Sequence, residues 1–260
     1  MIRYLVLGIV QGLTEFLPVS SSGHLVLAQR FLNVNPPGVL LEVVLHLGTL
    51  VAILVLFRCD LARLAKAIFS SGESRKEIIL LIVATLPIVL TGFFLGTQIE
   101  AAFTSSLLVG ICLLITGGLL FVADRAGRRA EKDAIRLPDA LVIGFAQAAA
   151  LLPGISRSGA TIGTGMILGI RGREAARFSF LLAIPAILAA GGLKLTQTVG
   201  RVSLDKGEWA GLLLGALAAA VVGALAIKGL LAIIARGKLK VFGIYCLALG
   251  LSAIIHANAA

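Results

Sequence analysis

The sequence predicts an all-α polytopic membrane protein with an inverted-topology repeat, each half containing a re-entrant helical hairpin and three transmembrane helices. Three observations predict this fold. Apolar residues make up 58% of the 260 residues and the mean hydropathy is +1.04, well above the roughly 45 to 50% apolar usage of a soluble domain. The apolar runs are about 17 to 25 residues long, which suits helices that cross a bilayer. One polar motif also occurs twice, 136 residues apart.

The first copy of the motif is residues 8–24, GIVQGLTEFLPVSSSGH. It places a carboxylate, three adjacent hydroxyls and an imidazole in an apolar sequence. A charged side chain at the bilayer centre costs on the order of 2.5 to 3.5 kcal/mol, so Glu15 is expected to face protein, water or a ligand. Pro18 and Gly23 interrupt a helix, and broken backbone at membrane depth is tolerated only inside protein or along a cavity. The segment is therefore predicted to be a site.

The pieces on either side of residues 18–22 are too short to cross separately, so they are predicted to form a re-entrant hairpin. Three expected spans follow, at residues 39–57, 77–95 and 107–123. The loops between spans differ in charge: five basic residues each in 58–76 and 124–136, and none in 96–106.

The second copy is residues 144–159, GFAQAAALLPGISRSG. Four positions coincide between the copies: Gln147, Ser156, Ser158 and Gly159 repeat Gln11, Ser20, Ser22 and Gly23. Three further spans are expected, at residues 178–197, 209–230 and 241–256. The chain is therefore expected to be one integral membrane domain, 1–260, with repeat 1 at about 1–123, a cytoplasmic linker at about 124–136 and repeat 2 at about 137–260.

Loop charge predicts the orientation, because Lys and Arg collect on the cytoplasmic side. If both five-charge loops are cytoplasmic, the odd number of spans between the hairpins makes the hairpins enter from opposite faces. Seventeen basic loop residues then lie inside, four lie outside (Arg3, Arg30, Arg201 and Lys206), and both termini face outward. Two broken hairpins near the midplane are typical of transporters, with the polar site at the repeat interface. GxxxG motifs at 159–163 and 165–169 favour close packing there.

The net charge of +10 raises the question of an acidic partner. The basic residues lie in loops between spans, where the positive-inside rule places them. No nucleic-acid partner is expected, and the membrane itself is the partner that composition predicts. A homo-oligomer is compatible with the sequence.

The two motifs together contain groups suited to phosphate chemistry. Arg157 and the glycine-rich PGISRSGAT backbone suit an anion such as phosphate. Glu15 suits a hard divalent metal, which takes oxygen ligands and bridges phosphate oxygens. Ser21 and His24 are three residues apart, as a nucleophile and general base would be on a helix. The other candidate substrate-binding side chains are Gln11, Ser20, Ser22, Ser156, Ser158 and Thr161.

The pieces EFLPVSSSGH and LPGISRSGAT, their order, and the flanking FSFLLAIPAIL closely resemble the BacA-type undecaprenyl-diphosphate phosphatases of bacteria. The resemblance covers essentially the whole chain. It implies hydrolysis of the lipid undecaprenyl diphosphate to the monophosphate and inorganic phosphate in the cytoplasmic (inner) membrane, with a divalent cation (Mg²⁺ or Ca²⁺). It also implies recycling of the cell-wall lipid carrier and bacitracin resistance. The family's functional residues fall on Glu15, Ser21, His24, Ser156, Arg157 and Thr161, and Gln11 occupies a position that is often Glu.

Several alternatives stay open at this point. A transporter or flippase of a polyprenyl phosphate would suit an inverted repeat equally well, although a nucleophile, a base and a phosphate clamp exceed what binding needs. Either Ser21 or His24 could attack phosphorus. The serines of both motifs could instead bond to backbone carbonyls or hold helices together. His46, in mid-span and outside both motifs, is expected to be a satisfied core histidine.

Overall fold

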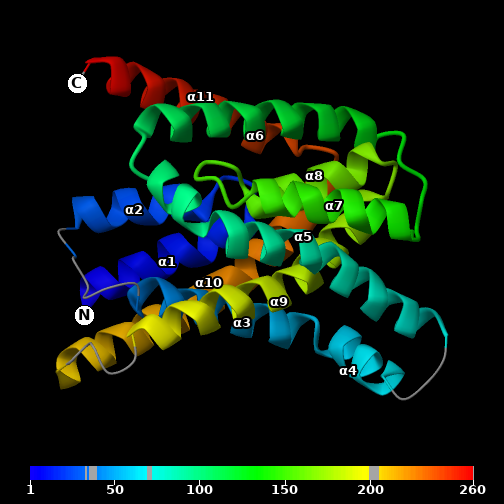
Figure 1. Cartoon of the computed structure of the whole chain (residues 1–260), viewed down its shortest axis with the longest axis horizontal. Helices are drawn as coiled ribbons and strands as arrows, with labels where there is room; N and C mark the ends of the chain where they lie inside the picture. The colour runs from blue at the N-terminus through cyan, green and yellow to red at the C-terminus, as the bar shows by residue number, and fades with distance from the viewer. Residues whose placement is uncertain (33, 35–39, 69–71, 199–204, 260) are drawn as a thin grey trace.

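The computed structural model describes residues 1–32, 34, 40–68, 72–198 and 205–259, which form eleven α-helices and no strand beyond one isolated bridge (Figure 1). The helices are α1 (Ile2–Phe16), α2 (Ser21–Phe31), α3 (Leu40–Leu56), α4 (Arg58–Ala67), α5 (Glu73–Ala102), α6 (Ser106–Gly127), α7 (Leu137–Ala149), α8 (Arg157–Ile167), α9 (Gly172–Thr198), α10 (Lys206–Ala235) and α11 (Lys240–Ala259). The expectation of an all-α protein is confirmed.

Up to six segments of the described residues are long and apolar enough to cross a membrane. Five are the single helices α5, α6, α9, α10 and α11, and the sixth is α3 with α4, which are bent by 78° relative to each other. Each corresponds to one of the six apolar runs in the sequence. The chain therefore has the spans of a multi-pass membrane protein.

Two segments that the sequence predicted as loops are partly helical. Helix α4 lies within the expected loop 58–76, and α5 continues to Ala102, into the expected loop 96–106. In α4 the side chains of Leu64 and Ala67 are buried and Leu61 packs against the core. The sequence analysis missed this narrow apolar stripe, because the charged residues on the other face made the segment look like a loop.

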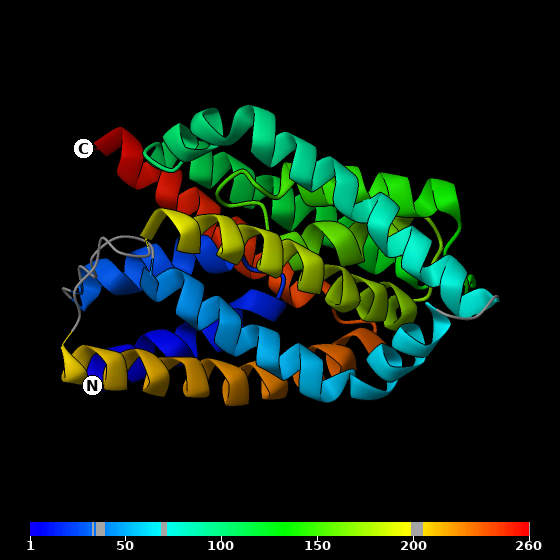
Figure 2. The same cartoon turned by 60° about the horizontal axis from the view of Figure 1, so that its bottom comes forward.

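The two motifs form two helical hairpins. Helices α1 and α2 contact each other across a break at residues 17–20, and α7 and α8 do so across a break at 150–156. The hairpins extend from opposite ends of the bundle, and both views show their breaks inside it (Figure 2). The hydroxyl of Ser158 donates to the carbonyl of Leu17 at 3.1 Å. The tips of the hairpins are therefore in direct contact.

Glycines bring each hairpin close to a long helix. A Cβ added at Gly8 in α1 would collide with the backbone of Gly215 in α10, and a Cβ at Gly144 in α7 would lie 2.7 Å from the carbonyl oxygen of Ala84 in α5. Helices α6 and α11 approach in the same way, since a Cβ added at Gly250 would lie 2.8 Å from the carbonyl oxygen of Gly110. Side-chain volume is excluded at these crossings, so the helix backbones pack directly on each other.

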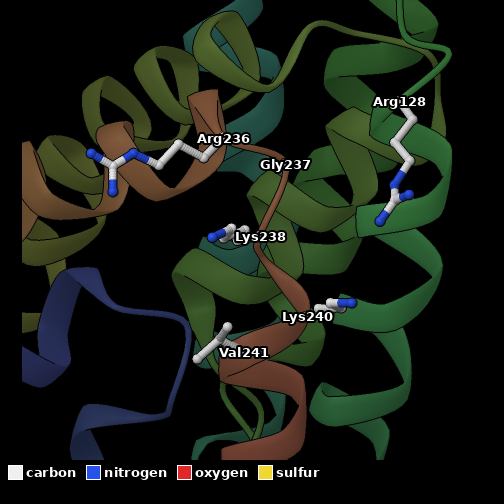
Figure 3. A pocket seen from close by; sticks show the side chains of 6 residues that line it. All are labelled: Arg128, Arg236, Gly237, Lys238, Lys240 and Val241. Carbon is white, nitrogen blue, oxygen red and sulfur yellow. The ribbon is translucent and has the colours of Figure 1, made fainter.

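The outer faces and one end of the bundle differ in chemistry. Large apolar side chains such as Phe93 and Phe94 of α5 are mostly exposed, as expected of a surface that faces lipid. At one end, where α10 turns into α11 beside the end of α6, a cavity of about 470 Å³ opens. Figure 3 shows Arg128 and Lys240 extending beside each other, with Arg236 pointing away from Arg128.

Candidate active site

Glu15, near the end of α1, is the centre of a polar cluster at the hairpin tips. Its side chain is only 6% exposed. Oε1 accepts a hydrogen bond from Nη2 of Arg157 at 2.8 Å, and Oε2 accepts from the hydroxyl of Ser21 at 2.7 Å and from Nε2 of Gln11 at 3.1 Å. Residues of both sequence motifs therefore surround one buried carboxylate. Their hydrogen bonds offset the desolvation cost of burying a charge alone.

Arg157 is the first residue of α8, and its side chain is 15% exposed. One terminal nitrogen binds Glu15, whereas the other, Nη1, is buried without a hydrogen-bond partner among the described residues. The guanidinium has five N–H donors in a planar fork. It can therefore keep Glu15 with one arm and bind an anionic oxygen with the other.

Ser21 begins α2 directly after a left-handed residue. Ser20 has φ of +68°, a conformation that is uncommon for a residue other than glycine. The reversal directs the chain into α2, whose first residue, Ser21, donates to Glu15. The hydroxyls of Ser20 and Ser22 lie 3.4 Å apart. The N-terminus of α2 therefore faces the same cluster as that of α8, and helix N-termini attract anions.

The hydroxyls of the second motif bond mainly to the protein itself. Ser156 caps α8 by accepting from the N–H of Gly159, and its Oγ lies 3.1 Å from that of Ser158. Thr161 donates to the carbonyl of Arg157 at 2.8 Å, and its hydroxyl lies 2.6 Å from that of Ser179 in α9. These contacts hold the first turn of α8, and with it the base of the Arg157 side chain, in a fixed position.

His24 lies one turn along α2 from Ser21 but contacts other groups. Its Nδ1 is 2.8 Å from the carbonyl oxygen of Ser20, and its Nε2 contacts the hydroxyl of Tyr245 in α11. In the described structure, the Ser21 hydroxyl donates to Glu15 rather than to His24. The spacing of three residues predicted His24 as the general base of Ser21, whereas the described contacts join Ser21 to Glu15 and His24 to Tyr245.

Two residues in contact with site residues were not found by the sequence analysis. His46 of α3, interpreted there as a core histidine, has Nε2 at 3.4 Å from Oε2 of Glu15 and Nδ1 at 2.7 Å from the carbonyl oxygen of Glu42. An ionisable ring in the middle of a membrane span was itself a signal of function, since such residues usually belong to functional sites. Tyr245 gave no such signal, because an isolated tyrosine in an apolar run is ordinary.

Helices α6 and α11 hold the breaks of the two hairpins. Thr116 of α6 donates to the carbonyl of Gly154 at 3.0 Å and accepts from the N–H of Ser156 at 3.2 Å. Cys246 of α11 donates from Sγ to the carbonyl of Pro18 at 3.4 Å. These bonds satisfy backbone groups that a broken helix exposes, which membrane-embedded backbone requires.

Comparisons with known proteins agree with this geometry. A sequence model of the family described as "Bacitracin resistance protein BacA" matches residues 4–252. The chain belongs to the BacA family. The resemblance of the chain to this family is therefore confirmed.

Several relatives that match nearly the full length of this chain carry a common name. Proteins called undecaprenyl-diphosphatase are 44% identical in Desulforudis audaxviator (97% of this chain, 96% of the relative), 42% identical in Syntrophotalea carbinolica (95% of each chain) and 40% identical in Halothermothrix orenii (98% of each).

Proposed function

We propose that this chain hydrolyses undecaprenyl diphosphate to undecaprenyl phosphate and inorganic phosphate, and so recycles the lipid carrier of cell-wall synthesis and confers bacitracin resistance. The observation that carries the proposal is the side chain of Arg157. Its Nη2 is hydrogen-bonded to Glu15, and its buried Nη1 has no hydrogen-bond partner among the described residues. The names of the relatives favour a phosphatase over a transporter.

The diphosphate head of the substrate and its polyprenyl tail are proposed to bind in different places. The terminal phosphate takes the free arm of Arg157 and the N-termini of α2 and α8, where positive partial charge and N–H groups favour an anion. Serine hydroxyls at the tips, those of Ser20, Ser22, Ser156 and Ser158, are the proposed further contacts. The polyprenyl tail stays in the bilayer along the apolar outer faces.

Ser21 is the proposed nucleophile. In the first step its Oγ bonds to the terminal phosphorus, the bridging P–O bond breaks, and undecaprenyl phosphate leaves. The Ser21 proton passes to Glu15, which already accepts it in a hydrogen bond of 2.7 Å. Arg157 stabilises the charge that develops on the phosphoryl oxygens.

Water then hydrolyses the phosphoserine. His24, on the same helix face one turn away, is assigned to this step, because its Nε2 is the nitrogen left without a proton when Nδ1 donates to Ser20. His24 takes up the proton that the attacking water releases, Glu15 returns its proton to Ser21, and inorganic phosphate is released. If His24 instead attacked phosphorus, the intermediate would be a phosphohistidine, which acid destroys and alkali spares.

A divalent cation fits this site only together with substrate. The described residues contain no cluster of three or more His, Cys, Asp or Glu side chains that could hold a metal ion. Among the same residues, Oε1 of Gln11 is buried without a hydrogen-bond partner, and Nε2 of Gln11 donates to Glu15. Magnesium is typically held by one or two protein oxygens and the phosphates of the substrate. We therefore propose that Glu15 and Gln11 hold Mg²⁺ or Ca²⁺ against the diphosphate. When bound, the ion would neutralise charge on the phosphate oxygens.

The halves of the chain are further proposed to form an inverted repeat, with repeat 1 at about 1–123 and repeat 2 at about 137–260. Pro18 and Gly154 are 136 residues apart, and their carbonyls accept hydrogen bonds from α11 and α6 respectively, at Cys246 and Thr116. Both termini lie at one end of the bundle and the turn between α10 and α11 lies toward the other (Figure 1). This arrangement supports outward-facing termini in a bacterial inner membrane.

Phosphate release from a C55 diphosphate by the purified protein in detergent tests the function. Multiple turnover that a chelator abolishes is expected. Movement of the labelled lipid across a vesicle membrane without release of phosphate would instead establish the transporter.

A further inference from the structure

Both ring nitrogens of His24 are engaged, and their partners differ in kind. Nδ1 lies 2.8 Å from the Ser20 carbonyl oxygen, which can only accept, so Nδ1 carries a proton. Nε2 lies 2.5 Å from the hydroxyl of Tyr245. In the neutral ring Nε2 has a lone pair and accepts from this hydroxyl. The Ser20 carbonyl therefore selects the tautomer, and the two partners together fix the orientation of the imidazole.

Tyr245 is itself held in place by its helix. The rings of Tyr245 and His24 stack, with centroids 5.6 Å apart and planes inclined by 18°. The next residue of α11, Cys246, is buried and donates to the carbonyl of Pro18 in the break of the first hairpin. Two consecutive residues of α11 thus contact the tip that carries Ser21.

A hydroxyl suits a base that changes its protonation state. It donates to Nε2 while the ring is neutral and accepts from Nε2–H once the ring has taken a proton. The contact between Tyr245 and His24 can therefore persist through a cycle of proton uptake and release, which a carbonyl or an ammonium partner would not allow.

We propose that Tyr245 is a positioning residue for His24 that also passes the proton to the ring. Its hydroxyl occupies the single lone pair of Nε2, gives its own proton to Nε2 and takes one from the attacking water. This assignment rests on the proposed phosphatase function. Tyr245 does not touch the cluster around Glu15 in any described contact, so its effect passes through the histidine ring.

Tyr245→Phe is the test variant, because it keeps the stacked ring and removes only the hydroxyl. We expect kcat to fall on the order of tenfold, the scale of one lost neutral hydrogen bond, with KM within about twofold because the bound phosphate loses no contact. Tyr4→Phe is the matched control, since the chain has two tyrosines and Tyr4 packs against Gly211 of α10. It should turn over as the wild type does.

Two further measurements separate positioning from general damage. In a His24→Gln background, Tyr245→Phe should cause no additional loss. In nitrogen-15 spectra of the imidazoles, the Nε2 signal of His24 should shift to that of an unbonded ring nitrogen in Tyr245→Phe and stay unchanged in Tyr4→Phe. The signal can be assigned by single substitutions, because the chain has three histidines.

Wild-type kcat in Tyr245→Phe, or an equal loss with and without His24, would overturn the proposal. The nitrogen spectrum needs no turnover. A wild-type protein that releases no phosphate would therefore refute the phosphatase function, whereas an Nε2 signal that ignores the Tyr245 hydroxyl would refute the positioning role.

Discussion

At the scale of single residues, the site is a carboxylate with every oxygen engaged by donors. Arg157 binds Oε1 of Glu15, while Ser21, Gln11 and His46 all lie against Oε2. In the proposed function a diphosphate binds the second arm of Arg157 and is attacked by Ser21, so both residues serve Glu15 and the substrate. The chemistry of each residue is then best measured by substitutions that preserve shape and remove one property.

Arg157→Lys keeps the positive charge and loses the planar fork. A lysine cannot bind Glu15 and a phosphoryl oxygen in fixed directions at once. We expect kcat to fall on the order of 10² or more, the scale of one lost transition-state donor, with a smaller change in KM. Steady-state phosphate release checks this. An unchanged kcat with a raised KM would make Arg157 a docking residue only.

Glu15→Gln keeps the shape of the side chain and removes its charge. Turnover should fall by on the order of 10² or more, because the acceptor for the Ser21 proton is lost, and the Mg²⁺ concentration needed for half-maximal rate should rise. Titration of phosphate release with Mg²⁺ measures both effects. Normal turnover with the wild-type metal requirement would show that Glu15 is structural.

His46→Leu should lower kcat on the order of tenfold, because Oε2 of Glu15 loses one neighbour. His46→Gln restores a donor and should recover most of the loss. His256→Leu, an exposed position near the end of α11, is the control. If His46→Leu and His256→Leu behave alike in phosphate release, His46 has no part in the site.

At the scale of elements, the hairpins depend on glycine contacts with long helices. In Gly8→Ala the new methyl group meets the backbone of Gly215, so the free energy of unfolding should fall by about 1 to 3 kcal/mol. Gly118→Ala in α6 is the matched control, since its new Cβ meets nothing within 4 Å. This variant should have an unchanged free energy of unfolding or be stabilised by about 0.5 to 1 kcal/mol. Denaturant titration in detergent compares them, and equal stability of the two variants would contradict close packing at Gly8.

The sequence predicted which helices exist more readily than it predicted which residues contact each other between them. The apolar runs predicted the spans because span length is set by bilayer thickness, and the motifs predicted the breaks and the meeting of the two hairpins. Helix α4 was missed because it has more charged residues than apolar residues that pack against the core. Tyr245 was missed because it is 221 residues from His24, and no local pattern encodes a tertiary contact of that kind.

At the scale of the whole molecule, orientation in the membrane is the open prediction. Cys59 is exposed in α4, within the expected cytoplasmic loop 58–76, so it should resist an impermeant maleimide in intact cells. In a Cys59→Ser background, a cysteine at Ser105 should react and one at Gly127 should not. Protection at Ser105 together with labelling at Gly127 would reverse the assignment.

The ion pair at the centre of the site also has a consequence for biosynthesis. Arg157 follows Glu15 by 142 residues, which at about 5 to 20 residues per second takes roughly 7 to 28 s to synthesise. During this interval the nascent first hairpin carries an acidic group whose cation does not yet exist, and burying that charge in lipid is unfavourable. The first hairpin is therefore expected to remain at the water-facing surface of the membrane, and to settle to its final depth only after the ribosome has delivered the second.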